Sequence, residues 1–226
     1  MKNIVVFASG NGTDLQAIMD ACDKGVLDAR VSAVISNNAG ARALERARAA
    51  GIAAYHVSAV KSGEASSTAD SATIIEVTAL NHAGSSADAA SPSESSAETT
   101  LRILDTHDAD IVFLAGYLRK IDPLVLERYH NRIFNIHPAL LPKYGGKGMY
   151  GIHVHEAVIK AGEKESGVTI HRVNEEYDTG DIVAQTIVPV LEGDTAESLA
   201  ARVLAREHEF IVEVLREIIS GAIALG

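Results

Sequence analysis

The feature that most constrains the fold is a regular alternation of short apolar runs with stretches of helical spacing. In the first quarter of the chain, helix-like stretches separate three strand-like runs, and together they occupy Asn3–Ala8, Thr13–Cys22, Val31–Ser36, Ala41–Ala50 and Ile52–His56. Strands that alternate with helices of this length form βαβ units, so the chain is expected to build a parallel sheet.

The middle of the chain is expected to continue this rhythm. A further helix is predicted over Ala69–Leu80, and two short apolar strands are predicted at Ile111–Ala115 and Arg132–Ile136. Small polar residues favour helix N-termini, so Thr13 or Asp14 is expected to cap the first helix.

The last third of the chain changes the pattern. The runs Gly167–Val173 and Asp181–Val190 lie too close together for a crossover helix, so they are expected to pair antiparallel. A long amphipathic helix, Ala196–Ile219, follows them. The elements therefore predict an α/β fold with a mostly parallel sheet, an antiparallel C-terminal portion and helices on both faces.

One segment does not follow the alternation. Residues Ala83–Ser96 (AGSSADAASPSESS) are rich in Ser and Ala, contain Pro92 and show no period. Both sides of the segment belong to the same rhythm. It is therefore interpreted as a flexible surface insertion at about residues 83–96 in a single domain that spans residues 1–226.

Charge and composition exclude some classes of partner. A formal net charge of −10 argues against nucleic acid, which needs clustered Lys and Arg, but it leaves room for a small anionic ligand held by backbone amides. The single cysteine, Cys22, fits a reducing compartment. No run is apolar for long enough to be a signal peptide or a membrane span. The sequence predicts a cytoplasmic protein, monomeric or homodimeric, that binds small molecules and neither nucleic acid nor membrane.

The loop Ser9–Asp14 (SGNGTD) leaves the first strand and enters the first helix. Its backbone N–H groups and the helix dipole would face a ligand at the carboxyl edge of the sheet. It is not a dinucleotide fingerprint, because Leu15 stands at the third glycine position and Ser36–Asn38 offer no acid for a ribose. A phosphate monoester fits better, and the alternative is a tight turn that needs glycine for its own geometry.

A second candidate is Asn135-Ile136-His137-Pro138, where a predicted strand stops. Residues two apart in a strand share a face, so Asn135 and His137 are expected to project together while Ile136 enters the core. An amide can stabilise a developing oxyanion, and an imidazole can carry a proton near neutral pH. A purely structural His-Pro turn is the alternative.

A third candidate is the acidic loop Asn174–Ile182 (NEEYDTGDI) between the two late strands. One of its carboxylates can fold back on His137 and favour the protonated ring. The alternative is a solvated hairpin loop.

Other polar groups carry weaker signals. His153-Val154-His155-Glu156 lacks the spacing of a metal-binding helix, so no metal site is predicted there. Lys143, Lys147 and Arg119 are candidates for steering an anionic ligand or are simply surface charges. Cys22 is interpreted as a small apolar residue of the first helix.

Taken together, SGNGTDLQAI, LAGYLRKI, NIHPALLPKYGGKG, EEYDTGDI and REHEF resemble the phosphoribosylglycinamide formyltransferases, a branch of the folate-dependent formyltransferase family. The resemblance covers nearly the whole chain except about residues 57–100. It implies a Rossmann-like formyltransferase fold. It also implies transfer of the formyl group of 10-formyltetrahydrofolate to the amine of 5-phosphoribosylglycinamide, the third step of de novo purine synthesis, without a metal.

The resemblance also implies roles for individual residues. Those that match the catalytic trio are Asn135, His137 and Asp178. Those that match substrate-binding positions are Gly12, Thr13, Asp14 and Glu207. Those that match folate-binding positions are Leu118, Arg119, Lys120, Ile121, Asn135, Asn174, Glu175, Glu176, Tyr177 and Asp178. In the implied mechanism, Asn135 and His137 stabilise a tetrahedral intermediate and Asp178 raises the pKa of His137.

The chain departs from the family pattern at two places. Asp14 stands where many members have Asn, and Ser66 stands where members often have a basic residue near the folate. The alternatives are a formyltetrahydrofolate hydrolase, which would share the catalytic residues, and a non-enzymatic nucleotide- or phosphate-binding module. A methionyl-tRNA formyltransferase is disfavoured, because it would need a tRNA-binding domain after the closing helix.

Overall fold

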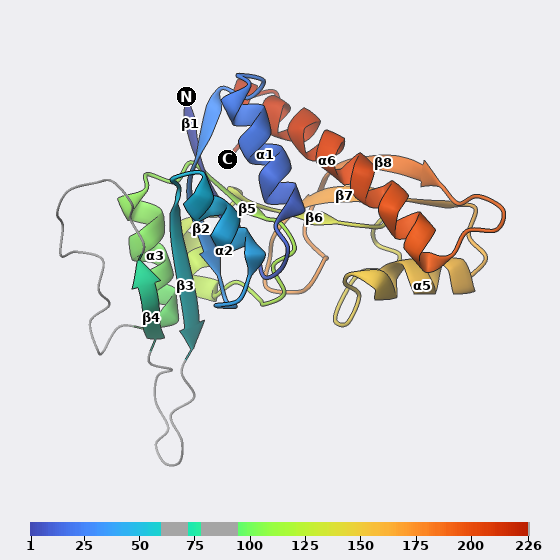
Figure 1. The fold of residues 1–226 in the computed structure, drawn as a ribbon, viewed down its shortest axis with the longest axis horizontal. Coiled ribbons are helices and arrows are strands. Elements are labelled where there is room, and N and C mark those ends of the chain that lie inside the picture. Colours follow the sequence, from blue (N-terminus) through green and yellow to red (C-terminus); the bar gives the residue numbers. More distant parts are fainter. Residues whose placement is uncertain (60–71, 78–94, 226) are drawn as a thin grey trace, which may run out of the picture.

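The computed structural model describes residues 1–59, 72–77 and 95–225, and its fold is shown in Figure 1. The described strands form one sheet in the order β4-β3-β2-β1-β5-β6-β7-β8. Their bounds are β1 Lys2–Phe7, β2 Ala29–Ser36, β3 Ala53–Ala59, β4 Ala72–Val77, β5 Ile111–Leu114, β6 Ile133–His137, β7 Glu165–Arg172 and β8 Ile182–Pro189.

The strand directions confirm the predicted fold class. Strands β3, β2, β1, β5 and β6 run parallel. Strand β7 runs antiparallel to β6, and β8 runs antiparallel to β7. The carboxyl ends of β1, β5 and β6 therefore lie side by side, at the edge where open α/β sheets bind ligands.

Helices cover both faces of the sheet, as predicted. They are α1 Thr13–Asp23, α2 Arg42–Ala49, α3 Ser96–Thr106, α4 Pro123–Arg128, α5 Ile152–Lys160 and α6 Ala196–Ser220. The inward residues of β1 alternate between two cores: Ile4 and Val6 pack with α1, α2 and α6, whereas Val5 and Phe7 pack with α3 and α4. Figure 1 shows α1, α2 and α6 on the near side of the sheet.

Two predictions about local structure were wrong. The helix predicted over Ala69–Leu80 is absent from its described part, because residues 72–77 form β4, which pairs antiparallel with β3. The segment ATIIEV is rich in β-branched residues, and β3 offers it an open strand to pair with. The rest of that prediction lies outside the described residues.

The second error concerns the start of α1. The N-cap is Gly12 at φ 70°, and neither predicted cap residue, Thr13 or Asp14, holds that position. Helices α3, α4 and α5 were not predicted. Helix α3 begins with a capping box between Ser95 and Glu98, inside the segment expected to be an insertion, of which residues 83–94 lie outside the described part.

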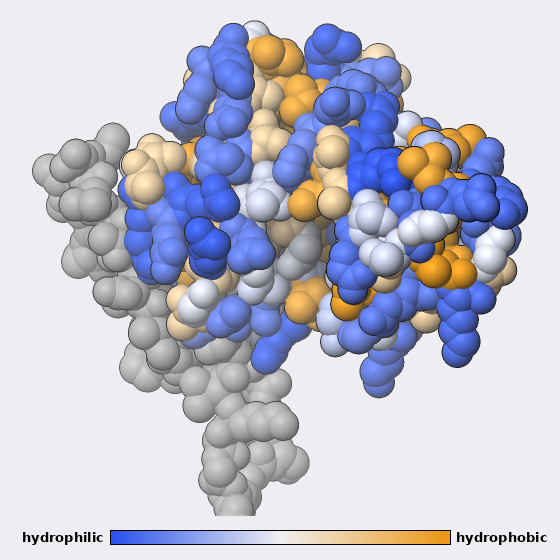
Figure 2. All heavy atoms as spheres, turned by 45° about the vertical axis from the view of Figure 1, so that its right-hand side comes forward, coloured by the Kyte–Doolittle hydropathy of each residue, from blue (hydrophilic) through white to orange (hydrophobic). Residues whose placement is uncertain are grey.

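On the face shown in Figure 2, most coloured side chains are hydrophilic and the hydrophobic ones form small patches. Among the described residues, no helix combines the length and the apolar character needed to cross a membrane.

Candidate active site

Strand β6 presents an amide and an imidazole at its carboxyl end. Ile136 points into the core with 5% of its surface exposed, and Asn135 and His137 project to the opposite face, as their spacing predicts. The loop before α1 lies beside them, because the N–H of Ser9 donates to the carbonyl oxygen of Gly116, which follows β5. The ends of β1, β5 and β6 therefore build one site.

The ring of His137 is buried and has a fixed orientation. Its Nε2 lies 2.8 Å from the carbonyl oxygen of Tyr144, so this nitrogen carries a proton. Its Nδ1 lies 3.6 Å from Oδ2 of Asp178. Burial lowers the pKa of His137, and the attraction of Asp178 raises it only in part. Asp178 therefore acts on the ring in the expected direction, and burial outweighs its effect.

Asp178 is the carboxylate of the acidic loop that folds back on the strand. Its Oδ2 accepts a hydrogen bond from the N–H of Gly146 at 2.9 Å, and its Oδ1 accepts one from Nδ2 of Asn135 at 3.3 Å. Burial alone would raise the pKa of Asp178, but His171, His137 and the Gly146 N–H together lower it. The group is therefore ionised at neutral pH, with 10% of its side chain exposed.

Asp178 also has an unusual backbone conformation. Its φ of 57° lies in the left-handed region, which costs roughly 1–2 kcal/mol for a residue with a Cβ. The hydrogen bonds to its carboxylate offset this cost and hold the loop against β6. Gly180, two residues later, has no room for a side chain, because a Cβ there would overlap the carbonyl oxygen of Arg172.

The sequence did not reveal a fourth member of this cluster, His171 on β7. Its Nδ1 lies 2.8 Å from the carbonyl oxygen of Arg172, and its Nε2 lies 3.0 Å from Nδ2 of Asn135 and 3.5 Å from Asp178. The ring thus orients the amide of Asn135. A signal was present, since His171 pairs directly with Asn135 once β6 and β7 are aligned antiparallel.

A cavity of about 510 Å³ opens in front of these side chains. Asn135, His137 and Asp178 line it together with Asp14 on α1 and Glu207 on α6. Residues 146–151 line another side. Both acids that the resemblance assigns to substrate binding therefore face the cavity of the catalytic trio.

Gly12 and Thr13 are not among the residues that line this cavity. Gly12 has a structural requirement of its own, because a Cβ there would lie 2.8 Å from Cα of Ala43 and its φ is 70°. The tight-turn interpretation of this glycine is therefore sufficient to explain it. The helix start that it forms still aims the N–H groups of α1 toward the carboxyl edge of the sheet.

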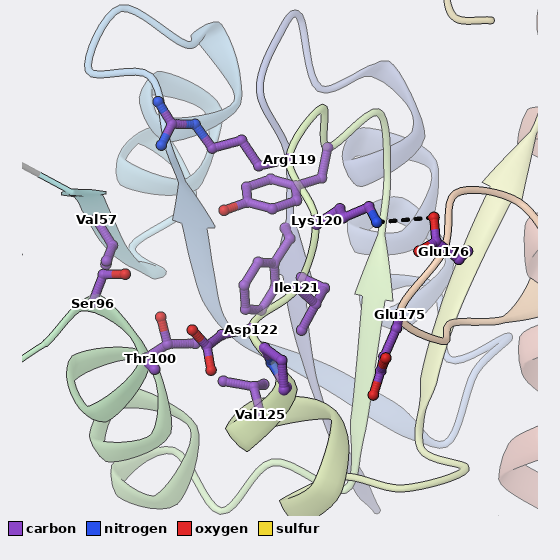
Figure 3. A pocket seen from close by; sticks show the side chains of 14 residues that line it. Val57, Ser96, Thr100, Arg119, Lys120, Ile121, Asp122, Val125, Glu175 and Glu176 are labelled. Carbon is purple, nitrogen blue, oxygen red and sulfur yellow. Dashed lines mark hydrogen bonds and ion pairs between the residues drawn. The ribbon is translucent and has the colours of Figure 1, made fainter. Parts of the chain in front are cut away.

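A second cavity of about 460 Å³ lies on the α3 and α4 side of the same edge (Figure 3). Arg119, Lys120 and Ile121 enter it from the loop after β5, and Glu175 and Glu176 face them from the acidic loop. The Nζ of Lys120 lies 3.0 Å from Oε2 of Glu176, so an exposed ion pair joins the two walls.

A smaller hollow of about 60 Å³ adjoins both cavities, because it shares Lys120 and Glu176 with the second and Asn135 and Asp178 with the first. It is bounded by Asn135 and Asp178 at one end and by the Lys120–Glu176 pair at the other. Asn174 and Tyr177 also line it, whereas Leu118 is half exposed and faces the first cavity. All ten positions predicted to bind folate therefore border one of three adjoining spaces.

Comparison with known proteins agrees with this architecture. The model of the family described as "Formyl transferase" matches residues 2–215 of the chain. The chain belongs to the formyl transferase family. A phosphoribosylglycinamide formyltransferase of Escherichia coli is 37% identical to it over 206 residues, which cover 91% of this chain and 82% of the relative.

Two further relatives show the same relationship. A chloroplastic phosphoribosylglycinamide formyltransferase of Arabidopsis thaliana is 39% identical over 214 residues, and this chain spans only 64% of that relative's length. The crystal structure of glycinamide ribonucleotide transformylase 1 from Symbiobacterium toebii superposes with a TM-score of 0.77 at 36% identity. It covers 98% of this chain and 89% of its own.

The other polar groups considered in the sequence lie apart from the cluster of Asn135, His137, His171 and Asp178. His153 and Glu156 form an exposed pair at 3.1 Å, and no group of metal-binding side chains occurs among the described residues. Lys143 pairs with Glu163 at 2.8 Å. Cys22 packs beside the core, and burial raises its pKa to about 11. Ser66 lies outside the described residues.

Proposed function

We propose that this chain transfers the formyl group of 10-formyltetrahydrofolate to the amine of 5-phosphoribosylglycinamide, and that residues 1–226 act as one formyltransferase domain. The observation that carries the proposal is the meeting of Asn135, His137 and Asp178 at the wall of the 510 Å³ cavity. These groups come from β6 and from a loop some forty residues later. An amide donor, an imidazole and a carboxylate are the groups that acyl transfer through an oxyanion needs.

Asn135 supplies the fixed donor in this mechanism. When the substrate amine attacks the formyl carbon, the carbonyl oxygen becomes an oxyanion, and an amide N–H of Asn135 stabilises it. The hydrogen bonds of Asn135 to His171 and Asp178 hold the amide in place before the reaction. Both N–H groups of the amide are thus already donated, so the longer bond, 3.3 Å to Asp178, has to open as the charge appears.

His137 handles the proton. Its neutral ring takes a proton at Nδ1, the nitrogen that no backbone carbonyl occupies, as the attacking amine loses it. The imidazolium then lies beside the ionised Asp178. Its positive charge stabilises the oxyanion in addition to the amide of Asn135. The proton leaves His137 for the folate nitrogen when the intermediate collapses, so the ring returns to its neutral form.

The second cavity supports the assignment of the formyl donor. Ile121, Val125 and Phe7 give it an apolar wall for a fused ring, and Arg119 and Lys120 give it positive charge for carboxylates. We further propose a cytoplasmic location, a monomer or homodimer, and no nucleic-acid or membrane partner, as the acidic composition favours.

One assay separates this proposal from its alternatives. The protein is incubated with 10-formyltetrahydrofolate, with and without 5-phosphoribosylglycinamide, and both folate product and formylated amine are measured. Stoichiometric formylation of the amine is the expected result. Deformylation that does not depend on the amine would indicate a formyltetrahydrofolate hydrolase, and absence of turnover would indicate a binding module.

A further inference from the structure

Three side chains form a row across the antiparallel part of the sheet. His137 of β6 pairs directly with Thr169 of β7, and Thr169 pairs directly with Gln185 of β8. Opposed residues of neighbouring strands project to the same face, so Thr169 and Gln185 lie on the face to which His137 projects. Two polar residues without a part in the proposed chemistry therefore lie in line with the imidazole.

The hydroxyl of Thr169 is completely buried and uses its whole hydrogen-bonding capacity. It donates to the carbonyl oxygen of Ala139 at 2.6 Å and accepts from the N–H of Leu141 at 3.1 Å. It also accepts from Nε2 of Gln185 at 2.8 Å. A hydroxyl has one proton and two lone pairs, so these three bonds satisfy it fully.

Gln185 binds the same segment from β8. Its Nε2 lies 3.0 Å from the carbonyl oxygen of Leu141, in addition to the bond to Thr169, and the two bonds account for both hydrogens of the amide nitrogen. The two side chains therefore attach the backbone of residues 139–141, which directly follow the His-Pro step, to β7 and β8.

Apolar packing fixes this segment as well. Leu140 packs directly on β7, because a Cβ at Gly167 would lie 2.5 Å from its Cδ2. Ala139 has none of its surface exposed and Leu141 only 5%. The backbone groups that Thr169 binds would therefore be left without a partner if the hydroxyl were removed.

The attached segment leads to the contacts that fix His137 and Asp178. Three residues beyond Leu141, the carbonyl oxygen of Tyr144 lies 2.8 Å from Nε2 of His137. Gly145 fits between Leu141 and Asp178, because a Cβ there would lie 2.5 Å from Cδ2 of Leu141 and 3.1 Å from Cβ of Asp178. A shift of Leu141 would therefore disturb both the hydrogen bond to the ring and the carboxylate beside it.

We propose that Thr169 and Gln185 are positioning residues for formyl transfer, and that they act by holding the carbonyl oxygen of Tyr144 against Nε2 of His137. This contact keeps the ring proton on Nε2 and leaves Nδ1, which faces Asp178, free to accept the proton of the attacking amine. Neither residue lines the three cavities of the site, so both act through the backbone of residues 139–144. The expected effect on rate rests on the proposed function, whereas the state of the ring is a property of the free protein.

Substitutions at Thr169 separate the hydroxyl from the shape of the side chain. Thr169→Val keeps the shape and should lower kcat by about ten- to a hundredfold, because a small displacement of a catalytic group is sufficient for such a loss. The KM for each substrate should change little, since no binding surface is altered. Thr169→Ser restores the hydroxyl and should retain near-wild-type kcat, although it removes a buried methyl group. Gln185→Met should show a smaller loss of kcat, because water can reach this position.

Nitrogen NMR of histidine-labelled protein shows which ring nitrogen of His137 carries the proton, without any substrate. The measurement is made at about pH 8, above the ordinary histidine pKa of about 6.5, and the signal is assigned by its loss in His137→Gln. We expect the proton on Nε2 in the wild type and in Thr169→Ser, and a larger share of it on Nδ1 in Thr169→Val.

The matched control is Thr99→Val on α3. Thr99 is as completely buried as Thr169, but its hydroxyl has no hydrogen-bond partner among the described residues. This variant should retain the wild-type kcat and the wild-type ring tautomer.

The inference is overturned if Thr169→Val loses no more kcat than Thr99→Val, if Thr169→Ser loses as much as Thr169→Val, or if kcat falls while the ring tautomer stays unchanged. Should Thr169→Val fail to fold, Gln185→Met decides by the same criteria. A changed tautomer in the variants of a wild type that transfers no formyl group would refute the proposed function alone. Formyl transfer by the wild type, with an unchanged tautomer in the variants, would refute this inference alone.

Discussion

Asp178 and Glu207 are both about nine-tenths buried and face the same cavity, yet their surroundings drive their pKa values in opposite directions. Asp178 receives hydrogen bonds from a backbone N–H and from Asn135, lies near two imidazoles, and has a lowered pKa. Glu207 has an acid for a neighbour and a raised pKa, and no hydrogen bond to its carboxyl occurs among the described residues.

The comparison shows that depth of burial does not by itself decide the charge of a carboxyl group. The number of donors that the fold brings to it decides whether the cost of desolvation is met. The catalytic end of the cavity is therefore preorganised around an anion, and the opposite end is expected to hold a proton. Four experiments test or sharpen this contrast.

The largest effect is expected when the catalytic end loses a donor. Asn135→Ala and His137→Ala should each lower kcat by about a hundred- to a thousandfold, because one partner of the developing oxyanion is lost. Steady-state kinetics with both substrates measures this. Asn3→Ala removes an amide at the far end of β1, where it bonds to the carbonyl oxygen of Asp108, and should retain near-wild-type kcat.

Either catalytic variant with near-wild-type kcat would contradict the assignment. Circular dichroism and urea unfolding of the same samples exclude a folding defect as the cause of a loss.

Stability should respond in opposite directions at the two ends. Asp178 has a lowered folded pKa, so it stabilises the protein above its unfolded pKa of about 3.9, and Asp178→Asn should cost about 1–3 kcal/mol at neutral pH. Asp14 has a raised folded pKa, so it loses stability as pH rises above that value. Asp14→Asn should therefore gain stability relative to wild type between about pH 5 and about pH 8.

Urea unfolding of the wild type and of both variants, repeated across this pH range, measures the two differences in the free energy of unfolding. If both variants shift the free energy of unfolding in the same direction at neutral pH, the contrast between the two acids is wrong.

A smaller effect concerns the titration of His137. Burial places its pKa below the ordinary value of about 6.5, and the nearby carboxylate opposes this. Asp178→Asn should lower the midpoint further, by about one pH unit, because the attraction of an opposite charge is lost. NMR titration of the ring in the free protein, wild type and variant side by side, measures the midpoint. A higher midpoint in the variant would contradict the geometry described.

The smallest effect is expected at the ion pair that joins the walls of the second cavity. Glu176→Gln should lower the KM for formyl folate by no more than about fivefold, since exposed pairs contribute about 1 kcal/mol or less. The KM should fall because Lys120, once released from Glu176, is free to pair with the carboxylates of the folate. Glu175→Gln removes the same charge one residue away and is the matched control. An equal change in both variants would show that general electrostatics, and not the pair, is responsible.

Much of the fold followed from periodicity along the chain. The parallel strands, the antiparallel β7 and β8, and the long helix α6 were predicted within a few residues, because each is long or strongly patterned. The strand β4 was not, since a short β-branched segment reads as helix or strand until the open side of β3 is known. Helix α4 spans only Pro123–Arg128 and is too short for a clear periodic signal.

The candidate site divides in the same way. The spacing of Asn135 and His137 was enough to place them on one face, because a strand alternates strictly. Resemblance, not spacing, singled out Asp178 and Glu207. His171 escaped notice, because its role depends on the register of β7 against β6.

The sequence by itself determined that Asn135 and His137 share one face at the end of a strand, since side-chain alternation along a strand follows from short-range physics. Only the tertiary structure decided the charge of each one. The ionisation of a buried group depends on donors that arrive from distant segments, such as the Gly146 N–H at Asp178, and on their absence, as at Glu207.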